Sequence, residues 1–399
     1  MEQDIPPIDH GAVAFNADSI LDTGPIDKLT RKYSRHHVHR LQNAVLMPGL
    51  VNTHTHLELP PLLDIIRADT FPNWVLNLIK TKRELTSHDY AVVASQNVKT
   101  LMHTGTTTVG EICTHNISTA VLKQSFLRAV IFYELISMNP LTPFPGLSFL
   151  ASRTTSRIQT GISPHAPHTV SEKILGALKK IADLKKAPLC MHVAESKDEI
   201  RLLQGKKSGF EKLYKAAGWD LAWAPSADSP FEYLKRTGLL SPSFLAVHAV
   251  QVTDDDIRLI KKSKVPIAHC PRSNKETGVG RMPLKKFLDA GITVGLGTDS
   301  LASSPSLNMW DEMRYTYRVH KRDGITAKDI FTLATIGGAK ALGMDKEIGS
   351  LEPGKRADII AVPLPSKNTG DIYSDLLRET KSCIMTMVDG KILYKNDAQ

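Results

Sequence analysis

Short apolar runs that end in polar or glycine-rich turns recur through the middle of the chain, and a segment of helical periodicity follows each of them. This alternation predicts β-strands that are connected by α-helices. Eight parallel strands with intervening helices favour a closed (β/α)8 TIM barrel over an open sheet, because the last unit then returns to the site of the first. The eight runs are Val45–Thr53, Thr106–Cys113, Arg128–Leu135, Ile158–Ser163, Pro188–His192, Phe244–Val247, Val265–Ala268 and Ile292–Gly297.

Both ends of the chain show a different pattern. Residues 11–24 and 357–394 predict short antiparallel strands, and Asp389-Gly390 predicts the turn of a hairpin. Between Pro363 and Ile372 the chain is rich in Pro, Ser, Asn and Gly, which predicts a loop. We therefore expect a small β-sandwich that is built from both chain ends.

The chain length agrees with this organisation. A (β/α)8 barrel commonly takes about 250 residues, so 399 residues allow one barrel and a modest second unit. We assign residues 1–47 and 347–399 to the composite β-sandwich and residues 48–346 to the barrel. Hydrophobic residues at 42% and charged residues at 23% are close to globular averages, which excludes collagen-like, coiled-coil and disordered classes.

Cysteine usage and the polar start of the chain indicate the compartment. Cys113, Cys190, Cys270 and Cys383 lie far apart and form no C-x-x-C pair, so neither a disulfide framework nor a zinc knuckle is expected. No apolar run reaches the length of a membrane span, and the start MEQDIPPIDH lacks the order of a signal peptide. The chain is expected to be cytoplasmic, with reduced thiols and no membrane partner.

The net charge of +9 raises the question of an anionic partner. The basic residues are scattered, and aromatic residues are not interleaved with the denser basic stretches as a stacking platform would require. We therefore expect no nucleic-acid partner and interpret the charge as a solvated surface.

Two histidines end the first apolar run. His54 and His56 are separated by one residue, and side chains at i and i+2 lie on one face of a strand, so both imidazoles can share a metal ion. A pair of buried structural histidines is the alternative for an isolated H-x-H. The other strands change that balance, because His192, His248 and Asp299 also follow predicted strands, at the end where barrel enzymes keep their sites. Three imidazoles and a carboxylate suit zinc or ferrous iron.

The motifs together resemble a known family. PGLVNTHTHLE, HVAES, VHAV, HCPRSN, GLGTDS and GSLEPGKRADI are similar to the amidohydrolase superfamily, in its cytosine deaminase and chlorohydrolase-like branch, over nearly the whole chain. The resemblance implies a metal-dependent hydrolase. The metal ligands that it implies are His54, His56, His192 and Asp299.

The number of metal ions follows from a departure within that family. Binuclear members carry a bridging carboxylated lysine after the fourth strand, where this chain has Ser163-Pro164-His165. One divalent ion is therefore implied, with Zn²⁺ as the first choice and Fe²⁺ as the alternative.

The resemblance also implies the catalytic groups. Glu195 stands where the similar deaminases keep a glutamate that moves a proton from water to the leaving ammonia. His248 would orient the attacking hydroxide, with a role as a fifth ligand as the alternative, and Asp299 would both bind the metal and accept a proton.

Further residues are candidates for substrate contact. Histidines after the fourth and seventh strands, the residues near the second of these, an aromatic residue and a carboxylate after the first strand fit this role. These substrate-binding candidates are His165, His168, His269, Arg272, Asn274, Trp74 and Glu58. Structural roles are the alternative, because loops at strand ends and aromatic side chains also serve packing.

The substrate is less determined by these motifs than the family. Retention of Glu195 favours loss of ammonia over displacement of chloride. NTHTHLEL, the Phe71–Trp74 segment, HCPRSN and GTDSLASS look most like the aminodeoxyfutalosine deaminases of menaquinone biosynthesis, which act on an adenine nucleoside. The alternatives are a deaminase of S-adenosylhomocysteine, methylthioadenosine or guanine, a hydrolase of ring amides or chlorinated rings, and a non-catalytic barrel scaffold.

Two expectations concern the surroundings of the site. The stretch of residues 205–240, with Trp219 and Trp223, reads as an insertion that either covers the substrate together with Trp74 or forms a plain surface loop. Related proteins often form homodimers, although the sequence identifies no interface.

Overall fold

The computed structural model describes residues 6–35, 37–139, 141–144, 146–150, 155–366 and 369–396. The first and last residues of the predicted β-sandwich lie outside these ranges. Residues 1–5, half of the polar start that argued against a signal peptide, also lie outside them. The boundaries at residues 47 and 347 stay a prediction.

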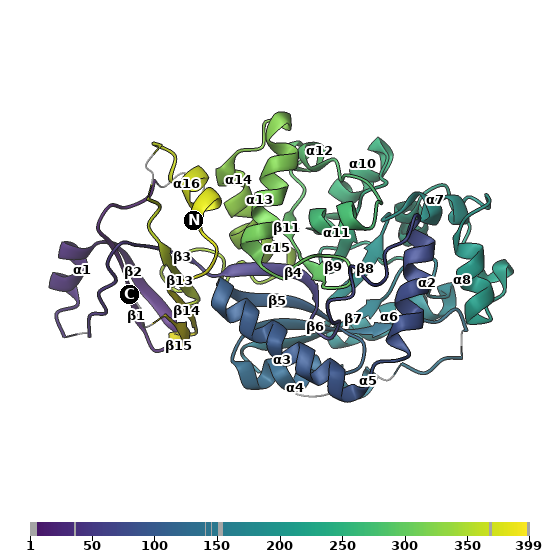
Figure 1. The fold of residues 1–399 in the computed structure, drawn as a ribbon, viewed down its shortest axis with the longest axis horizontal. Coiled ribbons are helices and arrows are strands. Elements are labelled where there is room, and N and C mark those ends of the chain that lie inside the picture. The colour runs from purple at the N-terminus through teal and green to yellow at the C-terminus, as the bar shows by residue number, and fades with distance from the viewer. Residues whose placement is uncertain are drawn as a thin grey trace.

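The central sheet is parallel and closes on itself (Figure 1). The segments at the two edges of the sheet, β11 and β12, are consecutive in the chain and only two residues apart. β11 pairs with β10, and β12 pairs with β4. This stretch is the eighth strand, so the (β/α)8 barrel is confirmed. The segments are β4 (Leu50–His56), β5 (Thr106–Cys113), β6 (Arg128–Leu135), β7 (Ile158–Pro164), β8 (Leu189–Val193), β9 (Phe244–His248), β10 (Ile267–His269), β11 (Val294–Leu296) and β12 (Asp299–Ser300).

The predicted strands agree closely with the barrel, apart from the first. The run Val45–Thr53 is two strands: β3 (Ala44–Pro48) belongs to a separate antiparallel sheet, and β4 begins two residues later. Gly49 lies between them, where a Cβ atom would be 2.1 Å from Thr107 Oγ1. The chain therefore passes from one sheet to the other at a residue without a side chain.

Helices surround the barrel, and short helices fill the connections (Figure 1). Their apolar faces pack on the strands, which are buried on both sides as expected for a parallel sheet. They are α2 (Phe71–Lys82), α3 (Ser87–Thr104), α4 (Ser118–Ser125), α5 (Leu147–Leu150), α6 (Glu172–Lys185), α7 (Lys197–Leu203), α8 (Phe210–Ala217), η1 (Leu221–Trp223), α9 (Pro230–Arg236), α10 (Asp254–Ser263), α11 (Pro271–Glu276), α12 (Leu284–Asp289), α13 (Met309–His320), η2 (Lys321–Asp323), α14 (Ala327–Thr332), η3 (Leu333–Gly337) and α15 (Gly338–Ala341).

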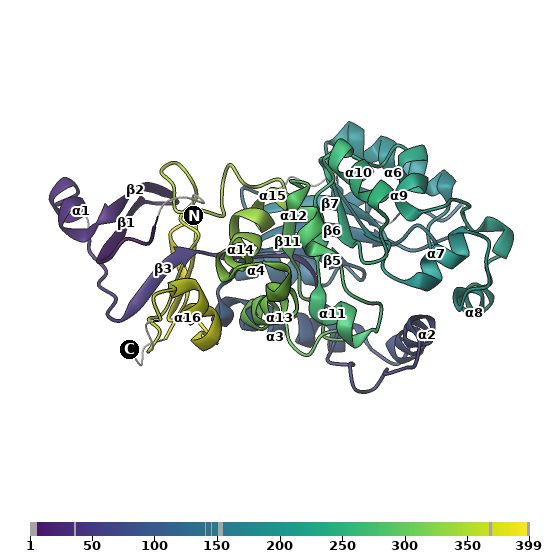
Figure 2. The same ribbon diagram turned by 90° about the horizontal axis from the view of Figure 1, so that it is seen from above.

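Both chain ends form a small β unit beside the barrel, which confirms the expected second unit (Figure 2). Its antiparallel sheet has the order β15-β14-β13-β3, and the hairpin β1-β2 packs with it around Ile20 and Met387. Asp389 and Gly390 have φ values of 47° and 71°, which fits the predicted hairpin turn. The remaining elements are β1 (Gly11–Asn16), β2 (Ser19–Pro25), α1 (Ile26–Lys32), β13 (Ile359–Pro363), α16 (Ile372–Glu379), β14 (Met385–Val388) and β15 (Lys391–Lys395).

A buried ion cluster joins the barrel to the small unit. Arg128, at the start of β6, is fully buried, and its Nε donates to Asp358 Oδ2 at 2.9 Å. Its Nη2 donates to Asp389 Oδ1 at 2.6 Å. The two aspartates flank β13 and β14, so one guanidinium holds the base of the barrel against the antiparallel sheet.

Two expectations about the compartment can be compared with the structure. Within the described ranges, no helix combines the length and the apolar character that crossing a membrane requires. All four cysteines are buried, and none is bonded to another.

Candidate active site

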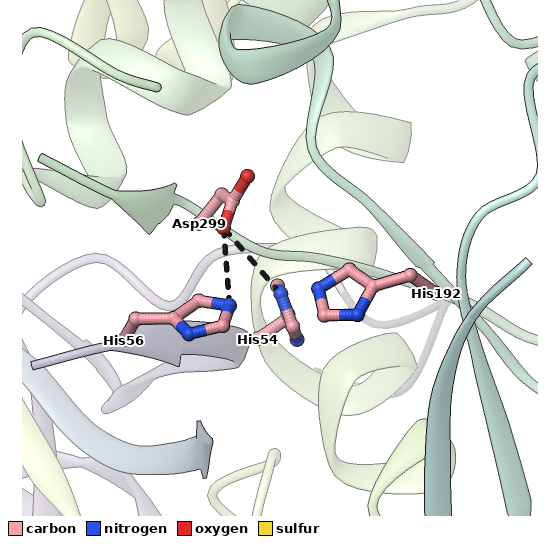
Figure 3. A group of neighbouring side chains, drawn as sticks. All are labelled: His54, His56, His192 and Asp299. Carbon is pink, nitrogen blue, oxygen red and sulfur yellow. Dashed lines mark ion pairs between the residues drawn. The ribbon is translucent and has the colours of Figure 1, made fainter. Parts of the chain in front are cut away.

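Three strands bring the predicted metal ligands together at one end of the barrel. His54 and His56 lie on β4, His192 on β8 and Asp299 on β12, and one ligand atom from each lies within 4.8 Å of the others. Figure 3 shows the four side chains pointing toward one common space. Asp299 Oδ1 is 3.5 Å from His54 Nε2 and 3.4 Å from His56 Nε2. The parallel strands end at the same face, which explains why residues so distant in sequence meet there.

Hydrogen bonds from the surrounding loops aim these ligands. His192 Nδ1 lies 3.0 Å from the backbone carbonyl of His165, to which it donates, so Nε2 is left for a metal ion. Ser273 and Ser303 donate to Asp299 Oδ2 at 2.6 and 2.8 Å, which leaves Oδ1 facing the histidines. The sequence interpretation did not include these two serines.

The electrostatic environment suits a divalent cation. Both ring nitrogens of His54 are buried and have no hydrogen-bond partner among the described residues. Burial lowers the pKa of His54 to about 4 and that of His56 to about 3, so both imidazoles are neutral, as ligation requires. Orphaned neutral imidazoles beside a carboxylate are a donor set that fits zinc or ferrous iron.

The backbone is strained where the strands end at this site. Asp299 has a φ of 56° and His248 a φ of 71°, a left-handed conformation that side chains other than glycine seldom adopt. Such strain costs on the order of 1–3 kcal/mol per residue and clusters at functional sites, where the surrounding structure compensates for it.

Glu195 and His248 face each other next to the metal ligands. His248 Nε2 is 3.5 Å from Glu195 Oε1, while His248 Nδ1 donates to Asn274 Oδ1 at 2.8 Å. Burial, with a further contribution from the Asp299 charge, raises the pKa of Glu195 well above its usual value. A carboxyl group in this environment readily takes up and holds a proton.

Glu199 supports this pair and was missed from the sequence. Its carboxylate accepts the backbone N–H groups of Ala194 at 3.0 Å and of Glu195 at 2.9 Å. Burial raises the pKa of Glu199 to about 7. The Ser196-x-x-Glu199 spacing, typical of a helix start, was the signal available in the sequence.

Three of the predicted substrate residues lie beside the metal ligands or in the segments that contact α2 and α8. The His165 ring centroid is 4.9 Å from that of His192, and His165 Nδ1 is 2.8 Å from Thr169 Oγ1. His168 stacks on Phe210 at 4.3 Å, and its Nδ1 is buried without a partner in the described chain. Trp74 also has a buried Nε1 with no acceptor among those residues.

Asn274 and His269 are placed differently. Asn274 reaches the site through His248, which it orients. His269 Nε2 lies 3.3 Å from His320 Nε2, and His269 Nδ1 is buried with no partner in the described ranges. We infer that Asn274 is a positioning residue.

The side chains of Glu58 and Arg272 form hydrogen bonds with other parts of the protein. The Glu58 carboxylate accepts the backbone N–H groups of His115 and Ile117, both at 2.8 Å, and also contacts Ser118. Arg272 Nη1 donates to Ser306 Oγ at 3.0 Å, and the backbone N–H of Arg272 donates to Glu312. The structure thus gives Glu58 contacts with the loop after β5, and it gives Arg272 contacts with the loop after β12 and with α13, where substrate contacts were expected.

A carboxylate missed by the sequence interpretation lies closer to the metal ligands. Glu134, next to the end of β6, has one oxygen within 4.8 Å of ring nitrogens of both His165 and His192. Its position at the end of the run Arg128–Leu135 was the available signal, since polar residues at barrel strand ends converge on the site.

The stretch of residues 205–240 forms helices beside α2, at the same end of the molecule (Figure 1). Phe210 of α8 meets Phe71 of α2 edge to face with ring centroids 6.1 Å apart. Tyr214 donates its hydroxyl to the His168 carbonyl at 2.7 Å. The expected insertion therefore contacts α2 and the loop after β7, while Trp223 is 46% exposed.

Comparisons with known proteins agree with this fold. A 5-methylthioadenosine/S-adenosylhomocysteine deaminase of Moorella thermoacetica is 30% identical, covering 97% of this chain and 90% of the relative. The fold matches Helicobacter pylori aminofutalosine deaminase with a TM-score of 0.87 at 24% identity, covering 96% and 94% of the two chains. It also matches a zinc-bound adenosine deaminase of Xanthomonas campestris with a TM-score of 0.79 at 24% identity, covering 97% and 90%.

The family model for the amidohydrolases covers the barrel and most of the four-stranded antiparallel sheet of the small unit, but not the hairpin β1-β2. It matches residues 45–393, which contain all four predicted metal ligands. The expectation of a hydrolase from this divalent-metal-dependent family is thereby confirmed. The chain belongs to the amidohydrolase family.

Proposed function

We propose that this protein hydrolytically deaminates an adenine nucleoside, with 6-amino-6-deoxyfutalosine as its substrate and menaquinone biosynthesis as its setting. The observation that carries the deaminase proposal is the buried Glu195 carboxyl group, 3.5 Å from His248 Nε2 and adjacent to the four converging ligands. Deamination needs such a group beside the reacting carbon, because the leaving amine must be protonated.

One divalent ion would be held by His54, His56, His192 and Asp299, with zinc as the first choice and ferrous iron as the second. The ion supplies Lewis-acid activation of water at neutral pH. The hydrogen bond that His192 Nδ1 donates and the one that Asp299 Oδ2 accepts keep the ligating atoms in place without further rearrangement.

The chain's own groups would manage the protons. Hydrolysis forms a carbon–oxygen bond at the ring carbon and breaks the carbon–nitrogen bond, and the amino group leaves as ammonia. Glu195 would accept a proton from the attacking water and deliver it toward the nitrogen atoms of the substrate. His248, whose Nδ1 donates to Asn274, would accept a hydrogen bond from the attacking water through Nε2, and Asp299 would take up the second water proton.

The substrate would lie between the barrel mouth and α2. His168 and Trp74 each have a buried ring nitrogen without a partner in the described ranges, and the His165 ring lies beside that of His192. The contact between Phe71 and Phe210 joins α2 to the insertion. We propose that α2 and residues 205–240 together cover the nucleoside and exclude water from it.

A second candidate substrate has its own support. The relative from Moorella thermoacetica is named for methylthioadenosine and S-adenosylhomocysteine, and it covers nearly the whole chain. These molecules share the adenine ring with aminodeoxyfutalosine, so Glu195 serves all three. Guanine and ring amides stay alternatives, because their leaving nitrogen also needs a proton. Chlorinated rings rank lower, because displacement of chloride needs no equivalent proton delivery, and a scaffold role ranks lowest because every catalytic residue is retained.

The deciding experiment is ammonia release by the zinc-loaded protein from aminodeoxyfutalosine, methylthioadenosine, S-adenosylhomocysteine, adenosine, guanine and cytosine. Glu195→Gln is the matched control, since it keeps the side-chain volume and removes the proton transfer. A response confined to aminodeoxyfutalosine supports the first substrate, and one led by methylthioadenosine supports the second. No release from any of them, with metal bound, would reject the deaminase proposal.

A further inference from the structure

One oxygen of the Glu134 carboxylate accepts a hydrogen bond, and the other has no donor among the described residues. Thr114 donates its hydroxyl to Glu134 Oε2 at 2.8 Å, whereas Oε1 is buried and has no donor within the described ranges. No lysine or arginine of those ranges forms an ion pair with it. A buried acceptor without a donor is unfavourable, so such an oxygen calls for a partner that the protein alone does not supply.

A second acceptor lies next to it. Thr169 donates its hydroxyl to the Ala166 carbonyl at 3.3 Å, so its oxygen accepts from His165 Nδ1 at 2.8 Å. The proton of the neutral His165 ring is then on Nδ1, and Nε2 carries a lone pair. Glu134 and His165 therefore offer two acceptors and no donor on the side of the barrel beside His192.

A second metal ion is a poor match for this pair. Among the described residues, the further ligand grouped with this pair is His192, whose Nδ1 donates to the His165 carbonyl. Its remaining nitrogen belongs to the four-ligand site, and one imidazole nitrogen binds one metal ion. The pair would hold a second cation with two ligands, fewer than divalent ions take in stable protein sites.

The topology separates this pair from the reacting groups. Glu134 and His165 follow β6 and β7, whereas Glu195 and His248 follow β8 and β9, so His192 on β8 lies between the two pairs. A substrate whose amino group faces Glu195 would extend its other end toward Glu134. In a nucleoside that end is the sugar, and two neighbouring hydroxyl groups present two donors to two acceptors.

We propose that Glu134, with His165, binds the vicinal hydroxyl groups of the nucleoside sugar and so selects ribonucleosides over their deoxy analogues. This inference rests on the proposed nucleoside substrate and adds the subsite that reads its sugar. Glu134→Gln is the informative change, because it keeps the volume and an acceptor for Thr114 while replacing the free acceptor by an amide donor.

The test measures binding without turnover. In the zinc-loaded Glu195→Gln protein, the dissociation constants of adenosine and 2′,3′-dideoxyadenosine are measured by calorimetry, with and without Glu134→Gln. Adenosine should bind about 10- to 100-fold more tightly than the dideoxy analogue, as expected for hydrogen bonds to a charged group, and Glu134→Gln should abolish that difference. Glu347→Gln, at a half-exposed carboxylate beside Arg356 and outside the site, is the matched control and should preserve it.

Several results would overturn the inference. They are equal weakening of both ligands by Glu134→Gln, no preference for adenosine in the parent protein, and no binding of either ligand. A metal content that falls from two ions to one in Glu134→Gln would assign the residue to a cation instead. If Glu134→Gln fails to fold, Thr114→Val frees Oε2 and should reduce the preference for adenosine by a smaller factor, and an unchanged preference would count against the subsite.

The proposed reaction is judged separately. Ammonia release by the parent protein with Glu195 intact, from aminodeoxyfutalosine, methylthioadenosine, S-adenosylhomocysteine or adenosine, tests the deaminase. A preference for the diol without ammonia release supports the Glu134 subsite and rejects that reaction, whereas ammonia release without the preference does the reverse.

Discussion

Removing Arg128 should expose how the small β unit is attached to the barrel. Arg128→Met keeps much of the side-chain volume and leaves Asp358 and Asp389 without their shared cation. The three side chains are 0%, 2% and 8% exposed, so the remaining carboxylates stay in a water-poor environment. Breaking a buried ion pair on one side costs about 3–5 kcal/mol, because the other charge is left uncompensated.

The expected change in Tm follows from the size of the chain. An unfolding entropy of about 2.1 cal/mol/K per residue gives about 0.84 kcal/mol/K for 399 residues. Dividing the free-energy loss by this entropy predicts that Tm falls by about 4–6 °C. Differential scanning calorimetry of the two proteins at the same metal loading measures this difference.

The loss should also depend on pH. Burial raises the pKa of Asp358, and Arg128 opposes that rise, so the variant should raise it further. A carboxyl group with a raised pKa in the folded state holds a proton that the unfolded chain has released, and stability therefore falls as the pH rises through the folded pKa. The deficit in Tm should thus be larger at pH 8 than at pH 5.

A matched control and a rescue make this reasoning refutable. Arg67→Met removes a 68% exposed guanidinium that pairs with Asp64, itself 86% exposed, and should leave Tm nearly unchanged, because exposed pairs contribute little. Adding Asp358→Asn to Arg128→Met removes one uncompensated charge and should recover part of the loss. A deficit no larger than that of the control, or one that is the same at both pH values, would refute the account.

Three further predictions concern the site. Asn274→Ala should lower kcat by about 10- to 100-fold, because the hydrogen bond that orients His248 is lost, and the metal content should stay the same. An unchanged kcat in the ammonia assay would contradict the positioning role. Burial raises the pKa of Glu199 from 4.5 to about 7, so the contribution of its proton to stability is lost as the pH rises through that window. The Tm advantage of the parent protein over Glu199→Gln should therefore shrink from pH 5 to pH 8. A constant difference in Tm would argue against this account. Chelation should remove one metal ion per chain, as measured by plasma spectrometry. It should lower Tm by about 3 °C relative to protein that is held in metal at 100 times the Kd of that metal. Two ions per chain would contradict the mononuclear site.

The apolar pattern of the sequence was sufficient for most of the barrel. Arg128–Leu135 and Thr106–Cys113 were predicted with the bounds that β6 and β5 have, because strands buried on both faces read as continuous apolar runs. The H-x-H spacing and the polar residues at strand ends also indicated one converging ligand set, since parallel strands bring their ends to a common face.

The tertiary structure decided what local patterns leave undetermined. From Val45 to Val51 the run has no polar side chain, so only the contact of Gly49 with Thr107 and the pairing with β13 reveal that it changes sheets. Glu58 and Glu134 are both carboxylates near strand ends, yet the first accepts backbone N–H groups of a loop and the second faces His165. Spacing along the chain fixes which face of a strand a residue occupies, whereas the direction of a side chain beyond the strand depends on donors supplied by distant loops.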